Sequence, residues 1–342
     1  MEVVKPVPAP APGTEARAAF ARLRTHLGER IVGQPDLVEK LLVCLLADGH
    51  LLVEGAPGLA KTTAIKTLAA ALEGAYHRIQ FTPDLLPADL TGTEIFQPET
   101  GTFRFERGPL FQNLVLADEI NRAPAKVQSA LLEVMQERQV TIGRETHKVP
   151  EPFLVMATQN PIETEGTYAL SEAQVDRFMM KVLITYPTEM DEFVVVERMT
   201  GALASVAPVL STEQLINLQK DVDRVFVDPV LMEYVVRIVS ATRIPKEYGL
   251  PEIGKYITYG ASPRASINLV LTARALAYMR GRDYVLAQDL KDVTHDVMRH
   301  RIVLSYEALS DETTSDALIT KILERIPVPV APMQGGHATA RA

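Results

Sequence analysis

The chain has 342 residues, which is enough for about two domains at roughly 150 residues each. Apolar residues make up 47% of the chain and charged residues 23%, so it can build a packed core, and a wholly disordered protein is excluded. The formal net charge of −8 argues against a protein that coats nucleic acid through bulk charge, and leaves room only for a local basic channel.

The cysteine content and the ends of the chain suggest a cellular setting. A single cysteine, Cys44, allows no intrachain disulfide, and its apolar neighbours predict a buried thiol. No apolar run reaches the roughly 18 residues that would span a membrane, and the first residues do not have the pattern of a signal peptide. We therefore expect a soluble protein of the reducing cytoplasm that does not insert into a membrane.

Strands and helices alternate through the first half of the chain. Proline-rich residues 1–13 are expected to form a disordered tail. Helices are expected at 14–27, 35–48, 61–72, 123–137 and 171–178. Short, uniformly apolar strands are expected at 50–54, 76–81, 114–117, 153–158 and 181–185. Apolar strands that are separated by helices indicate a parallel sheet with helices on both of its faces.

Two segments interrupt this α/β pattern. Residues 89–107 and residues 138–150 each alternate polar and apolar side chains around a turn that contains glycine. Both patterns predict β-hairpins that are inserted into the α/β framework.

The pattern changes after Pro187. Helices are expected at 189–200, 211–223, 229–243, 263–280, 286–300 and 311–324, with no convincing buried strand among them. We therefore predict an α/β domain over 14–187, a smaller all-α domain over 188–326 and a second disordered tail over 327–342.

A glycine-rich loop follows the strand that ends at Glu54. Its sequence, GAPGLAKT, is typical of the phosphate-binding pattern G-x-x-x-x-G-K-S/T, except that Ala60 replaces the second glycine. We expect backbone N–H groups to bind phosphate, Lys61 to neutralise its charge and Thr62 to ligate Mg²⁺. The alternative is a tight turn that carries a surface lysine. The predicted nucleotide-binding residues here are Gly55, Ala56, Pro57, Gly58, Leu59, Ala60, Lys61, Thr62 and Thr63.

Polar side chains also follow two later strands. Asp118 and Glu119 end the apolar strand at 114–117; we expect Asp118 to hold Mg²⁺ and Glu119 to polarise the attacking water. Asn160 follows the strand at 153–158, where it is expected to bind the γ-phosphate or its water, unless it only ends the strand in a turn. Together with the loop, these residues predict hydrolysis of ATP.

Four segments resemble one family closely. GAPGLAKT, LADEINRAPAKVQSALLEVMQE, ATQNPIETEGTYALSEAQVDRF and GASPRA are similar to the MoxR family of AAA+ ATPases, in the helix-2-insert group. The resemblance covers about residues 14–326. It implies an AAA+ phosphate-loop core, made of a parallel sheet flanked by helices with inserted β-hairpins, and a helical lid. MoxR loops often carry alanine at the position of Ala60.

The resemblance also implies roles for polar residues. Asn160 corresponds to sensor 1, and Arg264 to sensor 2, which reaches the γ-phosphate. Arg264 stands in the first turn of a predicted helix, where a cation opposes the helix dipole unless it meets a phosphate. Arg177 is the favoured arginine finger, supplied to a neighbouring subunit, and Arg122 is its rival. The alternative for Arg264 is a solvated surface arginine, and the alternative for Arg177 and Arg122 is a structural salt bridge.

Weaker parts of the resemblance concern three further residues. Gln80 corresponds to the polar residue that restrains the catalytic glutamate of AAA+ proteins. Val32 and Gly33, within the segment Ile31–Gln34, correspond to the segment beside the adenine ring.

The resemblance implies that the protein works as a ring, with a hexamer expected. It would act as an ATP-driven remodelling chaperone, with a partner that carries a von Willebrand factor A domain and a client protein that it helps to mature. Four apolar residues of the two hairpins either grip the client or simply pack: Phe96, Phe103, Phe105 and Ile142.

Three alternatives stay open. They are a chelatase-like motor subunit that inserts a metal into a tetrapyrrole, a nucleic-acid motor built on a related ring, and a small-molecule kinase. Nucleic acid is disfavoured because the hairpin at 89–107 is acidic and the hairpin at 138–150 is only mildly basic. The kinase is disfavoured because Arg264 and the helical lid would have no role in it.

Overall fold

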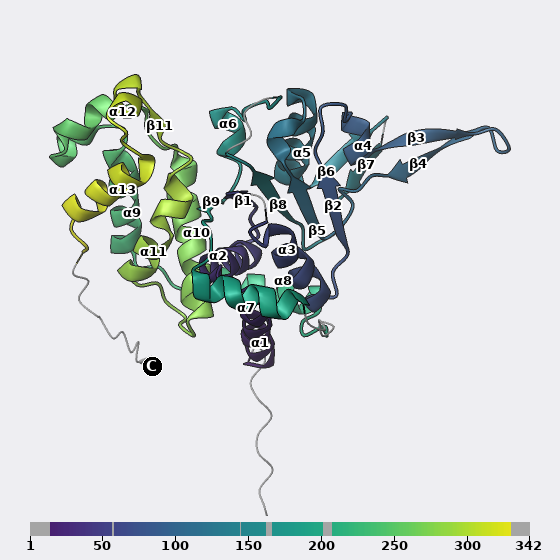
Figure 1. Ribbon diagram of the computed structural model, residues 1–342, viewed down its shortest axis with the longest axis horizontal. Helices are drawn as coiled ribbons and strands as arrows, with labels where there is room; N and C mark the ends of the chain where they lie inside the picture. The colour runs from purple at the N-terminus through teal and green to yellow at the C-terminus, as the bar shows by residue number, and fades with distance from the viewer. Residues whose placement is uncertain (1–13, 57, 144, 162–165, 201–206, 330–342) are drawn as a thin grey trace, which may run out of the picture.

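The computed structural model describes residues 14–56, 58–143, 145–161, 166–200 and 207–329 (Figure 1). Pro57, Arg144 and the predicted tails up to residue 13 and from residue 330 onward lie outside the described residues.

A five-stranded parallel sheet forms the centre of the molecule, as the sequence predicts. Its order is β2-β5-β8-β1-β9, and every neighbouring pair is parallel. The strands are β1 (Leu51–Glu54), β2 (Tyr76–Gln80), β5 (Leu114–Asp118), β8 (Leu154–Gln159) and β9 (Met180–Leu183). Because all five run the same way, the polar residues that end them meet at one edge of the sheet.

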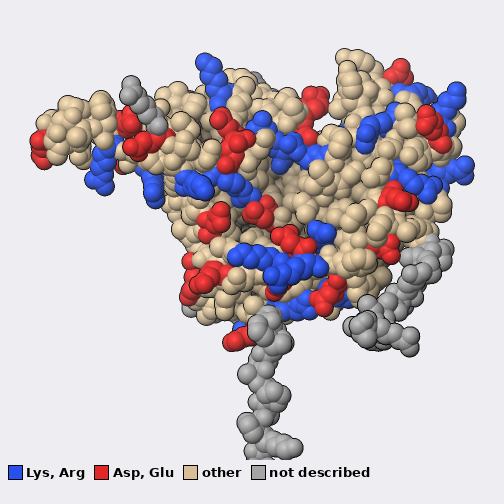
Figure 2. Space-filling model, turned by 180° about the vertical axis from the view of Figure 1, so that it is seen from behind, with Lys and Arg blue, Asp and Glu red and all other residues tan. Residues whose placement is uncertain are grey.

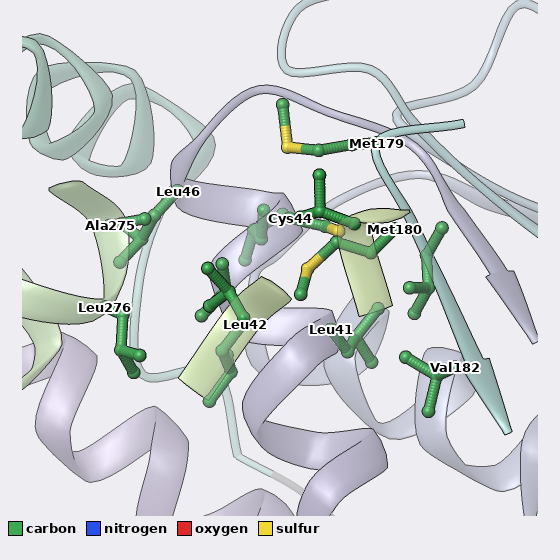
Figure 3. Close-up of a cluster of buried hydrophobic side chains, with 14 of the residues drawn as sticks. Leu41, Leu42, Cys44, Leu46, Met179, Met180, Val182, Ala275 and Leu276 are labelled. Atoms are coloured by element: carbon green, nitrogen blue, oxygen red, sulfur yellow. The ribbon is translucent and has the colours of Figure 1, made fainter. Parts of the chain in front are cut away.

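Side chains of the sheet alternate between two apolar clusters. In β5, Leu114 and Leu116 face a cluster with α1 (Thr14–Arg30), α2 (Pro35–Leu46) and α3 (Lys61–Ala71). Val115 and Ala117 face the second cluster, beneath α4 (Pro87–Thr91) and α5 (Ala125–Glu137). Apolar side chains therefore project from both faces of the sheet, as packing of helices on both sides requires. Figure 3 shows part of the first cluster, where Cys44 is buried as predicted.

Both predicted hairpins are present. The first pairs β3 (Gly92–Gln97) with β4 (Thr102–Arg107) and extends away from the sheet (Figure 1). The second pairs β6 (Gln139–Ile142) with β7 (Glu145–Lys148).

The four apolar hairpin residues separate into two pairs. Phe96 and Phe103 lie opposite each other across the first hairpin, 51% and 65% exposed, with ring centroids 5.3 Å apart. Phe105 instead stacks on His147 of the second hairpin, with 4.3 Å between ring centroids, and packs with Ile142 against the second apolar cluster. The first pair is therefore the more exposed of the two.

The second half of the chain is mainly helical. Its helices are α7 (Glu189–Thr200), α8 (Thr212–Asp223), α9 (Pro229–Ala241), α10 (Pro263–Met279), α11 (Ala287–Met298), α12 (Tyr306–Ser310) and α13 (Ser315–Arg325). They differ from the predicted pattern in three respects, the first of which is the short helix α12, which was not predicted. The helix expected at 311–324 begins only at Ser315, because Thr314 caps α13. A two-stranded ribbon of β10 (Ile257–Tyr259) and β11 (Val303–Leu304) was not predicted, since strands of two or three residues leave no periodic signal.

The helical half packs directly on the first helices of the chain. α8 and α10 both contact α2, and α8 also contacts α1. One continuous cluster of buried apolar side chains therefore runs from α1 into α13. The cluster does not break at residue 187, and the domain boundary there stays a prediction. No helix in the described parts of the chain has both the length and the apolar character needed to cross a membrane.

A buried histidine joins the sheet to α5. Backbone N–H of Val155 donates to Nδ1 of His50 at 3.1 Å, so Nε2 carries the proton and donates to the carbonyl of Met135 at 3.0 Å. Burial, together with the nearby charge of Arg138, lowers the pKa of His50 to about 3. The imidazole is therefore neutral in the fold throughout the neutral range.

We expect the free energy of unfolding to fall as the pH drops below about 6.5, because the unfolded chain protonates His50 and the native fold does not. The contribution of His50 is complete above pH 6.5. It decreases by about 1.4 kcal/mol for each pH unit below that value, until the folded pKa is reached. Chemical denaturation at a series of pH values measures this slope.

The variant His50→Gln keeps one acceptor and one donor but has no titrating group. It should be less stable at neutral pH and show a shallower slope down to about pH 4.5. His77→Gln, on the exposed part of β2, is the matched control and should keep the wild-type slope. An equal slope in wild type and His50→Gln would contradict the assignment.

Candidate functional site

A cavity of about 760 Å³ lies at the carboxyl edge of the sheet, where the glycine-rich loop meets β5 and β8. This volume lies within the range of small-molecule sites. Ten of the predicted site residues line it: Val32, Gly58, Leu59, Ala60, Lys61, Thr62, Thr63, Asp118, Glu119 and Asn160. The loop, the acidic pair and the end of β8 therefore converge, as expected for a nucleotide site.

The loop has the backbone that a phosphate cradle requires. A side chain at Gly55 would collide with Ile184, since its Cβ would lie 2.7 Å from the backbone oxygen of Ile184. Gly58 has a φ of +82°, and Ala60 a φ of +61° in the left-handed region. α3 begins directly after Ala60, so its free N–H groups point into the loop.

Ala60 explains why the usual pattern has glycine at this position. A left-handed conformation costs a residue with a Cβ atom on the order of 1 kcal/mol more than it costs glycine. Alanine, with the smallest side chain after glycine, still adopts it here. The departure from the pattern leaves the loop geometry intact.

The side chain of Lys61 contacts the glycine-rich loop. Its Nζ donates to the carbonyl oxygen of Gly55 at 2.8 Å. Burial lowers the pKa of Lys61, against the opposing charges of Asp118 and Glu119. The ammonium therefore faces both the loop and the acidic pair.

Hydrogen bonds to two neighbouring strands hold Asp118. Thr158 of β8 donates from Oγ1 to Oδ1 of Asp118 at 2.6 Å, and the same hydroxyl accepts from the backbone N–H of Glu119 at 2.9 Å. Arg78 of β2 donates to Oδ2 from Nη2 at 2.6 Å and from Nε at 3.0 Å. Neither Thr158 nor Arg78 was predicted from the sequence, because nothing in a linear pattern says which strands become neighbours.

Glu119 is oriented by two side chains. Its backbone is left-handed, with a φ of 57°, and turns the chain sharply at the end of β5. Gln80 donates from Nε2 to Oε2 of Glu119 at 2.8 Å, and Nε of Arg122 lies 3.0 Å from the same oxygen. Gln80 thus occupies the place at which the family resemblance puts a restraint on the glutamate.

Two predicted arginines lie elsewhere. Arg264 is not among the described residues that line the cavity; its Nη1 donates to Oδ2 of Asp176 at 3.1 Å. Arg177 lines a separate cavity of about 230 Å³ with Glu133 and Gln174. Both arginines thus gather around α6 (Glu172–Val175), the short remainder of the helix expected at 171–178. The expected reach of Arg264 to the γ-phosphate stays a prediction.

The segment predicted beside the adenine ring is only partly in the cavity. Val32 lines it, whereas Gly33 packs against Pro187 and Asp191. Side chains of α7 line the same region, namely Val195 and Arg198. Neither residue was predicted from the sequence, because α7 is far from the loop in the chain.

The residues present suit a Mg²⁺ ion. The hydroxyl of Thr62 and the carboxylate of Asp118 line one cavity and supply the hard oxygen ligands that Mg²⁺ prefers. Among the described residues, no cluster of three or more His, Cys, Asp or Glu could hold a metal. A magnesium site here would depend on these two residues, on water and on the phosphates of the nucleotide.

Comparison with known proteins gives a consistent result. Residues 50–180 match the ATPase family associated with various cellular activities (AAA), and residues 253–322 match the AAA lid domain. The chain is 49% identical to Chaperone MoxR1 of Mycobacterium tuberculosis, over 96% of this chain and 89% of that protein. It is 35% identical to Protein MoxR of Paracoccus denitrificans, over 92% of this chain and 97% of that protein. A crystal structure of a candidate ATPase from Cytophaga hutchinsonii superposes with a TM-score of 0.87 at 46% identity, covering 92% of this chain and 96% of that one.

Substitutions at Ala60 test whether its left-handed backbone shapes the loop. Ala60→Gly should bind a fluorescent ATP analogue within about threefold of wild type, because glycine adopts this conformation freely. Ala60→Val should weaken binding by about tenfold or more, because a β-branched residue is strained there.

Ala21→Val, an exposed substitution on α1, controls for the added volume and should bind like wild type. Equal binding by Ala60→Val and Ala60→Gly would mean that the backbone at this position does not matter for the nucleotide.

Proposed function

The chain belongs to the MoxR family of AAA+ ATPases. We propose that it works as a ring of identical subunits, which uses ATP hydrolysis to remodel a client protein. A relative that is 49% identical is named a chaperone, which supports this reading.

The proposed division of roles follows the geometry of the cavity. Backbone N–H groups from Gly58 to Thr62 and the ammonium of Lys61 bind the phosphates. Thr62 and Asp118 hold Mg²⁺, which would neutralise the charge that develops on the phosphate oxygens. Glu119 then accepts a proton from the attacking water and Asn160 positions that water, once Gln80 no longer restrains the glutamate.

The observation that carries the ring is the position of Arg177 and Arg264 outside the cavity of their own chain. Phosphoryl transfer in such sites is accelerated by an arginine at the γ-phosphate. In the described part of the chain the side chain of Arg177 makes no hydrogen bond or ion pair, while its backbone N–H donates to the carbonyl of Gln174 at 3.3 Å. We therefore assign Arg177 as the finger for the next subunit, with Arg264 beside it.

Arg122 is the weaker choice for this role. Its Nε lies 3.0 Å from Oε2 of Glu119 in the same chain, which supports a local ion pair rather than a contribution to a neighbour. Three other arginines line the cavity: Arg30 at the end of α1, Arg78 on β2 and Arg198 on α7.

The first hairpin is the proposed point of contact with the client. It extends from the body, and Phe96 and Phe103 form an exposed aromatic pair across it. A partner with a von Willebrand factor A domain and a cytoplasmic setting belong to the same proposal, and rest on the family resemblance. Aromatic pairs of this kind suit an apolar segment of another protein.

A nucleic-acid motor is supported less well. On the face shown in Figure 2, Lys and Arg side chains lie among Asp and Glu side chains and form no continuous basic band. A track for a phosphate backbone needs such a band. A chelatase-like role stays as the second proposal, tested by co-purification with a large tetrapyrrole-binding subunit.

Mass photometry with and without ATP tests the ring. Glu119→Gln should bind ATP, hydrolyse it about 10²-fold more slowly or worse, and accumulate as a species of about six subunits. If the wild-type protein stays a monomer while it binds and hydrolyses ATP, the proposal of a ring is wrong. If the ring forms, a pull-down on the Glu119→Gln assembly provides the client.

Mixing two inactive variants tests the finger. Arg177→Ala keeps its own nucleotide site but lacks the finger, and turnover should fall by roughly 10³-fold. Lys61→Ala has no working loop but still carries Arg177. Their mixture should regain part of the ATPase activity, because Arg177 of one chain completes the loop of the other.

Arg122→Ala serves as the comparison variant for the same mixing assay. If Arg122 acts only on Glu119 of its own chain, its mixture with Lys61→Ala should regain no activity. The opposite pattern, with recovery for Arg122→Ala alone, would exchange the roles of the two arginines.

A further inference from the structure

The side chain of Arg78 connects Asp118 to Gln80, the side chain that orients Glu119. Arg78 stands on β2, and its guanidinium donates twice to Oδ2 of Asp118, at 2.6 and 3.0 Å. Its Nη2 also donates to Oε1 of Gln80 at 2.9 Å. Gln80 in turn donates to Glu119. Arg78 thus begins a chain of hydrogen bonds that leads from the proposed metal ligand to the proposed base.

The contact with Arg78 determines which way the amide of Gln80 points. An amide has one accepting end and one donating end. Because Oε1 accepts from Arg78, Nε2 faces Oε2 of Glu119, at 2.8 Å. The reverse orientation would set an oxygen against a carboxylate and an N–H₂ group against a guanidinium. Arg78 therefore stabilises the orientation in which Gln80 restrains Glu119.

The same guanidinium binds the carboxylate of Asp118. Oδ1 of Asp118 accepts from Thr158 and Oδ2 accepts from Arg78, so both oxygens are engaged. A divalent cation beside this carboxylate and a guanidinium on it repel each other. The Arg78 side chain is 48% exposed, so it can move away toward solvent.

We propose that Arg78 is a positioning residue that couples metal binding at Asp118 to the release of Glu119. Without metal, Arg78 is paired with Asp118 and keeps Gln80 turned toward Glu119. When Mg²⁺ binds with the nucleotide, Arg78 leaves Asp118 and no longer donates to Oε1 of Gln80. The amide of Gln80 is then free to turn, and its hydrogen bond to Glu119 is lost. The inference rests on the roles proposed above for Asp118 and Glu119.

The planar guanidinium group of arginine is essential to this coupling. The planar guanidinium offers several donors in fixed directions, so it binds Asp118 and Gln80 at once. The ammonium of a lysine is a single point on a flexible chain and could not maintain both contacts in the same geometry. Arg78→Lys thus separates the charge at this position from the coupling.

The test follows Mg²⁺ binding directly. The full chain is titrated with MgCl₂ in the presence of a fluorescent ATP analogue, and the midpoint of the fluorescence change is recorded. In Arg78→Met the midpoint should fall by about tenfold, since Mg²⁺ no longer competes with a charged hydrogen bond. The affinity for the analogue in EDTA should stay at the wild-type value.

Two more variants locate the effect. His77→Gln, next to Arg78 on β2 and exposed, should leave the midpoint unchanged. Arg78→Lys should give an intermediate midpoint and so keeps the test informative if Arg78→Met folds poorly.

A double-mutant cycle tests the coupling to Gln80. Gln80→Leu alone should lower the midpoint by a smaller factor than Arg78→Met, because it removes one acceptor of the guanidinium. In the Arg78→Met background it should have no further effect. Equal factors in both backgrounds would show that Arg78 and Gln80 act independently, and would overturn the coupling.

Other results would contradict the proposal as a whole. A loss of analogue affinity in EDTA for Arg78→Met would make Arg78 a phosphate ligand. A midpoint equal to wild type in Arg78→Met would mean that the ion pair does not compete with Mg²⁺.

Asp118→Asn distinguishes this failure from a failure of the proposed function. If Asp118→Asn keeps the wild-type response to Mg²⁺, the role proposed for Asp118 is wrong. If it loses the response while the Arg78 variants match wild type, only the role of Arg78 is wrong.

Discussion

The parallel pairing of β2, β5 and β8 is the constraint on which the site depends. Gln80 is in register with Asp118 across β2 and β5, and Thr158 reaches Asp118 from β8. A shift of one residue in either pairing would turn these side chains to the opposite face of the sheet. The apolar alternation within β5 prevents such a shift, because each face of the strand is buried in its own cluster.

The second organising feature is the contact between the segment that follows α6 and the helical half of the chain. Asp176 accepts from Arg264, and Oδ1 of Asp176 lies 2.7 Å from Nε of Arg301. Arg301 is buried and also donates to the backbone carbonyls of Phe178 and Met179. Asp176 adjoins Arg177 in the chain, so the proposed finger stands beside the contact between the two halves. A tilt of the helical half would therefore act directly on Arg177.

The nucleotide cavity combines rigid and adjustable parts. The loop backbone, the buried strand ends and Thr158 have little freedom, because they are packed or hydrogen-bonded within the sheet. Arg78 and Gln80 are exposed and rely on each other for orientation. This contrast places the adjustable groups where the charge changes when a nucleotide and its metal bind.

The fold class, the phosphate loop and the acidic pair could be predicted from the sequence alone. Each of these is written in adjacent residues: an apolar strand, a glycine-rich turn and the first turn of a helix need no distant partner to be recognised. The sequence also shows that Ala60 replaces the second glycine of the usual pattern. The left-handed backbone of Ala60 explains why glycine usually stands there. The two hairpins followed from local alternation in the same way.

Which residues share a site across long stretches of chain follows from the tertiary structure and could not be predicted from local patterns. Arg78 and Thr158 meet at Asp118 although 80 residues separate them, because strand order is a property of the sheet and not of any segment. The same reason accounts for α7 in the cavity and for Arg264 on Asp176 rather than at its own loop. A linear pattern predicts what a residue can do, whereas the packing of distant elements decides where it does it.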